Sequence, residues 1–532
     1  MNTLYLKAEE ENTADIAGGI LRGGGLVAIP TETVYGLAAN AFDAAAVKKI
    51  FEAKGRPQDN PLIVHVQSLD EIPALVEKVD PRLPALAERF WPGPLTVIMK
   101  RSSLVPDEVT AGLDTVAIRM PSHPAARAVI AAAGVPLAAP SANASGRPSP
   151  TKAEHVKRDL DGRIDAVIDG GECQVGVEST VITLVTEPPT LLRPGGVTPE
   201  ELRKVLGDIE VSHAVFEKLE EGEKAQSPGM KYKHYAPEAP VTIVKGSFEI
   251  YKKFVLAHRE KVCAVCFDGE GENFECSLEF GREDDSAAQA HKIFDVLRRV
   301  DETGCSQAFV RCPSPGGVGL AVYNRLLRSA AFRVLDLDFT VPVYGLTGQT
   351  GAGKGYAGKI LSELGMSVID TDLVARQAVL SPEVIRSLKA AFGDDIYAGG
   401  VLDRGELARR AFSDEKKTRL LNSITHPEIT RLTAGLIHEA EKSGARAAVI
   451  DAPVLFESPI AALCDKIICV TAPESVRIER IMRRDGISRE QALLRIGAQR
   501  DEEYYKSKSD IIIVNDGKND IKTEILNRKD LI

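Results

Sequence analysis

A glycine-rich stretch two thirds of the way along the chain has the residues and spacing of a phosphate-binding loop. It runs from Gly345 to Gly355 and contains the pattern Gly-x4-Gly-Lys, which ends at Lys354. An apolar run that predicts a strand precedes the loop, and a helical pattern follows it. Backbone N–H groups, a helix N-terminus and a lysine charge together cradle a phosphate. We therefore expect contacts with a nucleoside triphosphate from Gly348, Gly351, Ala352, Gly353, Lys354 and Gly355.

Carboxylates and arginines beyond this loop could complete a site for phosphoryl transfer. Asp370 and Asp372 follow the next apolar strand, where such a site needs a base or a metal partner, and Arg376 comes one helical turn later. We take Asp370 as a candidate Mg²⁺ ligand. Further on, four arginines stand at helical spacings. By themselves they would indicate a solvated helix face, but beside a phosphate loop they predict a lid over the nucleotide: Arg477, Arg480, Arg483 and Arg484.

Five polar loops before residue 200 form a second group of candidate site residues. They cover residues 30–37, 54–62, 141–146, 178–181 and 193–195. Each loop taken singly could be an ordinary turn, because Ser, Asn, Gly and Pro are the residues that turns use. Lys54 and Arg56 could likewise be a solvated helix end. Together the loops supply fixed cations, hydroxyls and an amide, which a site for a triphosphate and a small polar substrate requires.

The elements that must position these loops alternate between short apolar strands and amphipathic helices. The first group has predicted strands at 26–29, 62–66, 95–99, 116–118, 167–168 and 181–184, and helices at 44–53 and 124–133. A second group has strands at 241–244, 262–267 and 308–310, and helices at 287–300 and 320–331. The third has strands at 341–346, 447–450, 466–470 and 510–515. The alternation predicts α/β folds, with a doubly wound parallel sheet in the last group.

Length and composition limit the number of domains and the class of protein. A chain of 532 residues predicts about three domains, and a net charge of −10 argues against a generally basic surface that coats nucleic acid. Cys263 and Cys266 form a C-x-x-C, but they lie in an alternating apolar run, so we expect a buried strand and no structural metal. The acidic N-terminus and the lack of a long apolar run predict a cytoplasmic protein with no signal peptide and no membrane span.

Taken in order, the five polar loops resemble those of the L-threonylcarbamoyl-AMP synthase family, which has a YrdC-like α/β fold. Residues 227–237 are similar to the linker that leads, in longer members, to a second small α/β domain. The resemblance predicts a YrdC-like domain at 1–226, a linker at 227–240 and a small domain at 241–337. It implies ATP contacts from Lys54, Arg56, Asn60, Ser141, Asn143, Arg193 and Tyr235. It implies L-threonine contacts from Thr33, His65, Arg119 and Ser179, although His65 could also be an interior histidine of a strand.

The resemblance also implies a reaction. L-Threonine and bicarbonate form a carbamate, which attacks the α-phosphate of ATP and releases pyrophosphate. The product, L-threonylcarbamoyl-AMP, serves separate proteins that modify adenosine 37 of tRNA; direct contact with tRNA is left open. No Ser–His–Asp or Cys–His set is visible, and an in-line attack on phosphorus mainly needs alignment and neutralised charge. Tyr235 could close over the site and exclude water.

From about Tyr344 to Asn515 the chain resembles dephospho-CoA kinase, which phosphorylates the 3′-hydroxyl of dephospho-CoA, and we expect a P-loop domain at 341–532. The resemblance implies that Asp372 is the base, that Lys354 holds the β- and γ-phosphates and that Arg376 contacts the CoA substrate. Arg480 and Arg484 would neutralise charge in the transition state, with Mg²⁺ as cofactor. One departure stands out, because the family has Ser-Thr after the lysine and this chain has Gly355 and Tyr356. The domain could be a working kinase, a slow one, or a module that binds nucleotide without turnover.

The main hypothesis is therefore one polypeptide with two unrelated ATP-using enzymes. Its rival makes the N-terminal domain an RNA-binding module beside a P-loop domain that binds nucleotide without turnover. A third hypothesis is a carbamoyltransferase maturation factor of the same fold, but the zinc fingers and acylphosphatase pattern of that family are absent from the sequence.

Overall fold

The computed structural model describes residues 2–218, 235–518 and 521–528. The chain divides into two compact units, one of residues 1–243 with 260–334 and one of residues 244–259 with 335–532. The division passes through the sheet that follows residue 240, so it does not define domains, and the domain bounds given above stay predictions. Most of the predicted linker lies outside the described residues; Tyr235 and the residues after it lie within them.

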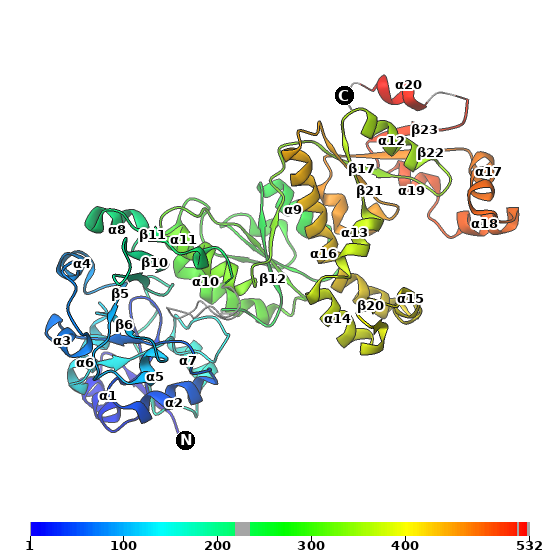
Figure 1. Cartoon of the computed structure of the whole chain (residues 1–532). Coiled ribbons are helices and arrows are strands. Elements are labelled where there is room, and N and C mark those ends of the chain that lie inside the picture. The colour runs from blue at the N-terminus through cyan, green and yellow to red at the C-terminus, as the bar shows by residue number, and fades with distance from the viewer. Residues whose placement is uncertain (1, 219–234, 519–520, 529–532) are drawn as a thin grey trace. The chain divides into compact units, whose positions relative to one another are not determined.

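A large mixed sheet organises the first unit (Figure 1), with the strand order β1-β8-β2-β3-β7-β4-β6-β5-β9-β10-β11. Its strands are β1 (Leu4–Lys7), β2 (Val27–Ile29), β3 (Gly36–Asn40), β4 (Ile63–His65), β5 (Leu95–Lys100), β6 (Thr115–Arg119), β7 (Leu137–Ala138), β8 (Ala166–Asp169), β9 (Thr180–Thr183), β10 (Thr190–Arg193) and β11 (Glu210–Val211). The helices are α1 (Thr13–Arg22), α2 (Ala44–Lys54), α3 (Ile72–Leu75), α4 (Leu83–Phe90), α5 (Asp107–Thr110), α6 (Pro124–Ala133), α7 (Ala153–Leu160) and α8 (Pro199–Leu206).

Helix α2 illustrates how local sequence positions a site residue. The Asp43 carboxylate accepts hydrogen bonds from the Ala45 and Ala46 N–H groups and so caps the first turn. Gly55 ends the helix in the left-handed conformation, with φ of 61°. Between these ends, apolar residues pack into the core. Lys54 is therefore the last residue of a well-defined helix rather than part of a free loop.

The sheet that follows residue 240 has the strand order β14-β13-β15-β12-β16, and β13 runs parallel to both of its neighbours. Its strands are β12 (Val241–Lys245), β13 (Cys263–Cys266), β14 (Ser277–Glu279), β15 (Ala308–Arg311) and β16 (Val334–Asp336). The helices in this stretch are α9 (Phe248–Leu256), α10 (Ser286–Val300) and α11 (Gly319–Ser329). Every residue of β13 is buried, so the prediction that Cys263 and Cys266 lie in a buried strand is confirmed.

A parallel sheet carries the phosphate loop, in the order β18-β21-β17-β22-β23. The strands are β17 (Val343–Thr347), β18 (Ser367–Asp370), β21 (Ala448–Asp451), β22 (Lys466–Thr471) and β23 (Ile511–Val514), with a separate hairpin of β19 (Tyr397–Ala398) and β20 (Val401–Leu402). The helices are α12 (Lys354–Glu363), α13 (Thr371–Ala378), α14 (Pro382–Phe392), α15 (Arg404–Ala411), α16 (Glu415–Lys442), α17 (Glu474–Asp485), α18 (Arg489–Gly497), α19 (Glu502–Lys506) and α20 (Ile521–Leu526). The predicted α/β class and the doubly wound parallel sheet are confirmed.

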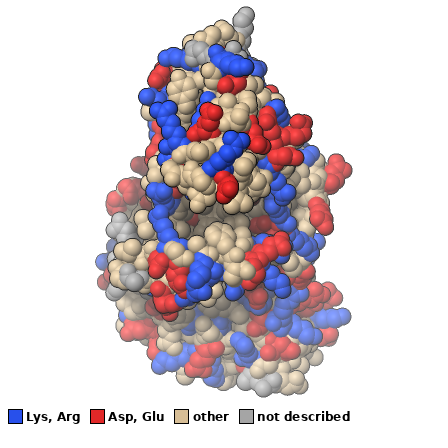
Figure 2. All heavy atoms as spheres, turned by 90° about the vertical axis from the view of Figure 1, so that its right-hand side faces the viewer, with Lys and Arg blue, Asp and Glu red and all other residues tan. Residues whose placement is uncertain are grey.

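The surface carries charges of both signs. On the face that Figure 2 shows, Lys and Arg side chains are interspersed with Asp and Glu, without an extended field of one sign. Within the part of the chain that the structure describes, no helix is both long and apolar enough to cross a membrane.

Candidate active sites

A pocket in the first unit gathers most of the residues predicted for the first reaction. Residues from all five polar loops line it, together with residues of β4 and β6 and Tyr235. The predicted residues in its lining are Lys54, Arg56, His65, Arg119, Ser141, Asn143, Ser179, Arg193 and Tyr235. The sheet brings them together because β7, β4 and β6 are neighbours in it. Strand β7 runs antiparallel to β4, so the loop after β7 lies beside the loop that leads into β4. Asn60 and Thr33 are not in the lining.

Lys54 holds the loop after β7 in place. Its Nζ donates to the backbone oxygens of Ser141 and Asn143, the latter at 2.5 Å, and lies 3.4 Å from Asn143 Oδ1. Burial and the neighbouring charge of Arg56 hold the pKa of Lys54 well below its ordinary value. An anionic phosphate in the pocket would favour the charged form again, so this lysine is suited to binding one.

Arg56 and Asn60 lie on the same loop, one in the pocket and one behind it. Arg56 Nη2 donates to the backbone oxygens of Asn60 and Pro61, at 3.1 and 3.4 Å, and burial lowers the pKa of Arg56 to about 10. Asn60 is almost fully buried, and its side-chain oxygen and nitrogen have no hydrogen-bond partner among the described residues. A buried amide without partners is costly, which indicates a group that a ligand or a small movement of the loop satisfies.

Ser179 and Arg193 are hydrogen-bonded to each other in another wall of the pocket, away from Lys54. Arg193 donates from Nε to the Ser179 backbone oxygen at 3.0 Å and from Nη2 to its hydroxyl at 3.1 Å. The Ser179 hydroxyl also lies 2.7 Å from that of Thr96, on β5. Burial, followed by the charge of Arg325, lowers the pKa of Arg193 to about 10. The serine hydroxyl and the guanidinium are thus held in one fixed arrangement.

Arg119 and His65 come from the neighbouring strands β6 and β4, where they are Cα partners in register. Arg119 Nη2 lies 2.6 Å from Glu32 Oε1, and both side chains are buried. Burial works to raise the pKa of Glu32, but the charge and hydrogen bond of Arg119 outweigh it and the pKa falls below its ordinary value. Burial and Arg119 also lower the pKa of His65 to about 3. His65 is therefore a neutral side chain in the wall of the pocket.

Thr33 supports the pocket through its neighbour Thr31. The Thr33 hydroxyl is fully buried and lies 2.8 Å from the Thr31 hydroxyl, which in turn donates to the Val34 backbone oxygen. Thr31, not Thr33, is in the pocket lining. The structure thus places Thr33 behind the surface that a substrate would meet.

Tyr235 closes one side of the pocket and contacts the stretch of chain after residue 260. It is buried, with its ring centroid 5.0 Å from that of Phe294 on α10 and 5.8 Å from the guanidinium carbon of Arg325 on α11. The Ala236 N–H donates to the Gly146 backbone oxygen at 3.0 Å. Burial, and after it the charge of Glu178, raises the pKa of Tyr235 to about 12.

Two acidic residues belong to this site although sequence reasoning assigned them no role. Glu178 lines the pocket, and Glu32 pairs with Arg119. Both stand inside loops that the sequence singles out, next to predicted residues. The signal that could have found them is an acid inside an otherwise hydroxyl-rich loop, because a buried carboxylate needs a partner cation. Which cation it meets depends on strand order, which the sequence does not state.

The phosphate loop of the second unit lies between β17 and α12, as predicted, and α17 packs on it. Arg477 donates to the Gln349 side chain at 2.6 Å and to the Thr350 backbone oxygen at 3.0 Å. Arg480 contacts the Gly351 and Ala352 carbonyl oxygens at 3.4 and 3.3 Å. A Cβ at Gly348 would clash with the Val470 backbone, and a Cβ at Gly353 would clash with the Asn515 side chain. These glycines let the loop approach its neighbours closely.

Carboxylates meet at the ends of two strands beside the loop. Asp370 on β18 and Asp451 on β21 are Cα partners in register, and the Asp451 carboxylate pairs with Lys354 Nζ. Burial raises the pKa of Asp451, although the Lys354 ammonium opposes the shift. Asp370 caps α13 by accepting the Asp372 and Leu373 N–H groups. Among the described residues, no group of three or more His, Cys, Asp or Glu side chains is arranged to hold a metal ion by itself.

The remaining predicted residues of this unit are exposed. Asp372 and Arg376 lie on α13 with exposed side chains. Arg484 lies on α17, pairs with Asp485 at 2.7 Å and is 60% exposed. Gly355 is exposed in the first turn of α12, and a Cβ at this position would meet no atom within 4 Å. The glycine is therefore not required by packing.

Comparison with known proteins assigns both units. Family models match residues 19–195 (telomere recombination), 197–331 (threonylcarbamoyl-AMP synthase, C-terminal domain) and 342–520 (dephospho-CoA kinase).

A threonylcarbamoyl-AMP synthase of Pyrococcus abyssi is 46% identical over 332 residues, which is 62% of this chain and 97% of the relative. The crystal structure of P. abyssi Sua5 complexed with L-threonine is similar with a TM-score of 0.59 and 43% identity, over 63% of this chain and 99% of that one. A dephospho-CoA kinase of Carboxydothermus hydrogenoformans is 38% identical over 180 residues, 33% of this chain and 87% of the relative. The chain therefore belongs to the threonylcarbamoyl-AMP synthase family over its first two thirds and to the dephospho-CoA kinase family over its last third, and it unites the two enzymes in one polypeptide.

Proposed function

We propose that the pocket of the first unit makes L-threonylcarbamoyl-AMP from L-threonine, bicarbonate and ATP, with the residues that line it as the binding groups. The observation that carries the assignment is the convergence of cations, hydroxyls and an amide in one pocket: Lys54, Arg56, Ser141, Asn143, Ser179 and Arg193. Separate fixed positions for a triphosphate and an amino acid are what an adenylate-forming reaction needs.

Roles follow from position. Lys54 and Arg56 bind phosphates from the end of α2, and Arg193 binds from the opposite wall. Ser141 and Asn143, held by Lys54, orient the adenylate. Arg119, oriented by its ion pair with Glu32, binds the threonine carboxylate, with Ser179 beside it. His65, with a pKa of about 3, accepts or donates a hydrogen bond in its neutral form and does not change charge during the reaction.

The reaction proceeds by alignment and charge neutralisation. Threonine and bicarbonate give a carbamate, whose oxygen attacks the α-phosphorus as pyrophosphate leaves. The cations on both walls stabilise the charge that develops on the phosphate oxygens. Tyr235 and the pocket walls exclude water, which protects the mixed anhydride from hydrolysis. Asn60 and Thr33 support this arrangement from behind the surface, Asn60 through its loop and Thr33 through Thr31.

A paired substitution on α2 tests the site. Lys54→Met removes the cation that holds the 141–146 loop, and we expect pyrophosphate release to fall about 100-fold or more, as positional errors near 1 Å do. Lys49→Met is the matched control, because Lys49 Nζ also donates to a backbone oxygen, that of Gly24, but away from the pocket. The assay measures pyrophosphate with all three substrates and with each one left out. Equal release without threonine, or equal loss in both variants, would contradict the proposal.

In the second unit we assign the kinase roles to residues around the phosphate loop. Lys354 binds the β- and γ-phosphates of ATP and gives up its pairing with Asp451 when it does so. Asp372 takes the proton from the 3′-hydroxyl of dephospho-CoA, Arg376 contacts that substrate, and Arg480 and Arg484 neutralise charge on the phosphates.

Mg²⁺ fits this site as a partner of ATP. Asp370 and Asp451 offer carboxylate oxygens beside the loop, and Mg²⁺ commonly keeps several waters and leans on substrate phosphates. It would neutralise charge on those phosphates. Since Gly355 has no hydroxyl to offer, the Asp370 and Asp451 carboxylates would supply the protein's share of Mg²⁺ binding.

The wider partners are also proposals. We infer that the adenylate passes to separate proteins that modify tRNA, and that the protein works in the cytoplasm. The net charge of −10 and the pocket rich in hydroxyls do not favour the RNA-binding alternative. RNA binding that persists at saturating ATP, without pyrophosphate release, would support that alternative instead.

A further inference from the structure

Two buried arginines reach the walls of the synthase pocket from helices that lie far from it in sequence. Arg298 belongs to α10 and Arg325 to α11, both in the part of the first unit after residue 260. Their exposed fractions are 5% and 0%. Desolvating a guanidinium is expensive unless its hydrogen bonds are well used. The hydrogen-bond partners of these two arginines therefore indicate which part of the pocket each one holds in place.

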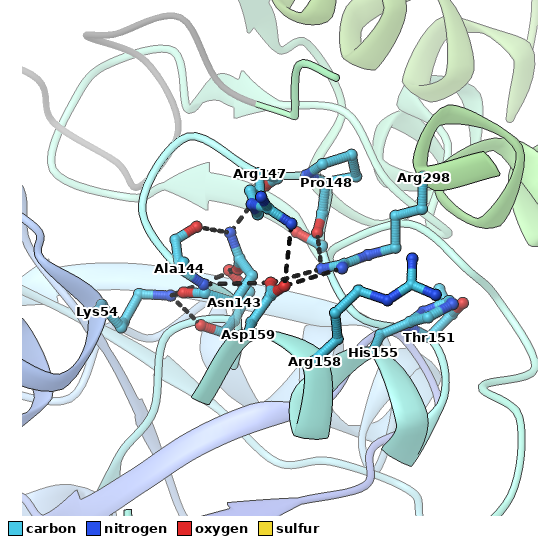
Figure 3. Close-up of polar contacts among 12 residues, drawn as sticks. Lys54, Asn143, Ala144, Arg147, Pro148, Thr151, His155, Arg158, Asp159 and Arg298 are labelled. Atoms are coloured by element: carbon cyan, nitrogen blue, oxygen red, sulfur yellow. Dashed lines mark hydrogen bonds and ion pairs between the residues drawn. The ribbon is translucent and has the colours of Figure 1, made fainter. Parts of the chain in front are cut away.

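Arg298 is bonded to the loop that carries Ser141 and Asn143. Its Nη1 and Nη2 lie 3.2 and 2.8 Å from the two carboxylate oxygens of Asp159, and Nη2 also donates to the Pro148 backbone oxygen. Asp159, on α7, accepts the Ala144 N–H at 3.2 Å. Figure 3 shows this arrangement, with Lys54 bonded to the same loop from the other side. The loop is thus fixed between a lysine of α2 and an arginine of α10.

Arg325 is bonded to the opposite wall. Its Nε lies 2.6 Å from Glu178 Oε2, and its Nη2 donates to the Pro194 backbone oxygen at 2.9 Å. These partners flank Ser179 and Arg193 in sequence. The Ser149 hydroxyl donates to the other Glu178 oxygen at 2.5 Å. Burial works to raise the pKa of Glu178, but the charges of Arg325 and Arg193 outweigh it and keep the pKa low.

We propose that Arg298 and Arg325 are positioning residues of the synthase, and that each fixes one wall of the pocket from a helix of the small α/β region. The inference rests on the pocket assignment made above and deepens it. Arg298 sets the geometry of the adenylate loop, and Arg325 sets the geometry of the wall that holds Ser179 and Arg193. The small region is therefore part of the active-site scaffold.

The two walls predict different kinetic effects. Arg298→Met removes the bonds that fix the 141–146 loop and the Pro148 backbone beyond it. We therefore expect the KM for ATP to rise about tenfold or more, while the KM for L-threonine changes less than about threefold. Arg325→Met disturbs the wall with Ser179, and we expect the KM for L-threonine to rise about tenfold or more. Arg298→Lys and Arg325→Lys keep the charge but reach fewer acceptors, so each should recover part of the loss. Initial rates of pyrophosphate release at varied ATP and varied threonine give both constants.

Arg328→Met is the matched control. Arg328 lies on α11 beside Arg325, is 4% exposed, and a hydrogen bond of its guanidinium goes to the Ala214 carbonyl oxygen, outside both walls. It should leave the ratio of the two KM values near that of the wild type. Because removing one partner of a buried pair can unfold a protein, the neutral pairs Arg298→Met with Asp159→Asn and Arg325→Met with Glu178→Gln are measured as well. The thermal transition that ATP and L-threonine shift upward reports whether the first unit of each variant is folded.

These experiments distinguish a failure of the positioning role of Arg298 and Arg325 from a failure of the pocket assignment. Wild-type constants in the Arg298 and Arg325 variants and in the neutral pairs would overturn the inference, and so would equal changes in Arg328→Met. If Lys54→Met also retained full activity, the pocket assignment itself would be wrong. Loss in Lys54→Met with no substrate-specific change in the arginine variants would refute only the positioning role.

Discussion

At the scale of single residues, Gly355 is where this phosphate loop departs from the pattern with Ser or Thr after the lysine. It stands where related phosphate loops have a hydroxyl, it is exposed, and a side chain there would meet open space. Neither packing nor backbone conformation requires glycine at this position. The missing hydroxyl is therefore a chemical difference at a site whose frame is intact, with Lys354 and Asp451 in contact.

Gly355→Ser should raise the rate of dephospho-CoA phosphorylation. One hydrogen bond to a charged partner is worth about 1.5 kcal/mol or more, which corresponds to about a tenfold change in rate. The gain should be largest at low Mg²⁺, where a protein ligand matters most. Coupled measurement of ADP release at several Mg²⁺ concentrations checks the prediction.

Gly435→Ser is the control for helix stability alone. Gly435 is an exposed glycine in α16, and a Cβ there would meet no atom within 4 Å. Serine at this position therefore changes helix propensity without adding a ligand to the loop. A similar gain in both variants would trace the effect to helix stability. No activity in either wild type or Gly355→Ser would leave a domain that binds nucleotide without turnover.

His65 is a second residue whose environment predicts a measurable effect. Its folded pKa of about 3 lies below the value near 6.5 of an unfolded chain. Between these values the unfolded state binds more protons, so stability falls as the pH drops from 6.5 toward 3, by at most about 1.4 kcal/mol per pH unit. Between about pH 7 and pH 5 this amounts to about 2 kcal/mol.

His65→Gln should therefore make the first unit less sensitive to acid. Thermal melting of the full chain at about pH 7 and pH 5 checks this, followed on the transition that ATP and L-threonine shift upward. His213→Gln, at an exposed position, is the control. An unchanged pH dependence in His65→Gln would show that His65 does not set the slope.

At the scale of elements, helix α17 connects the phosphate loop to the rest of its unit. One face of the helix bonds to the loop through Arg477 and Arg480, one turn apart, whereas Arg484 is directed to Asp485 and solvent. Buried Arg477 holds Gln349 and Thr350 and so shapes the start of the loop. The helical spacing of the arginines predicted a lid; the structure distinguishes the residues that hold the loop from those that are exposed.

Arg477→Met should weaken ATP binding by the kinase. Loss of its charged hydrogen bonds to the loop, worth about 1.5 kcal/mol or more, predicts a KM for ATP about tenfold higher. Arg483→Met is the control, because Arg483 lies on the same helix with an exposed side chain. Kinase rates at varied ATP measure the effect, and pyrophosphate release by the first unit should not change. Equal effects of the two substitutions would contradict the role given to Arg477.

At the scale of the whole molecule, each enzyme has its own site and its own sheet. The synthase pocket is built from loops of the large mixed sheet and closed by residues after 234, and the phosphate loop follows β17 of the parallel sheet. The products of the two reactions do not feed one another.

Much of this organisation was predictable from local sequence. The phosphate loop could be recognised because strand, glycines, lysine and helix are consecutive, and the α/β class followed from the alternation of short apolar runs. Helix α6 was predicted with both of its ends, at Pro124 and Ala133, from the helical period of its apolar residues. The strands that were not predicted include β1, β3, β7, β10, β11, β14 and β16. Periodicity alone does not separate so short a run from a loop or a buried helix segment.

Other features required the tertiary structure, because they depend on residues that are distant in sequence. The sequence alone determined which residue types were available for each reaction and roughly where their loops lay. Tertiary structure paired Glu32 with Arg119, placed Thr31 in front of Thr33, joined Lys354 to Asp451 and brought Arg298 and Arg325 to the synthase pocket. Each pairing stabilises a buried charge or polar group, and a buried charge finds its partner through strand order and helix packing rather than through spacing along the chain.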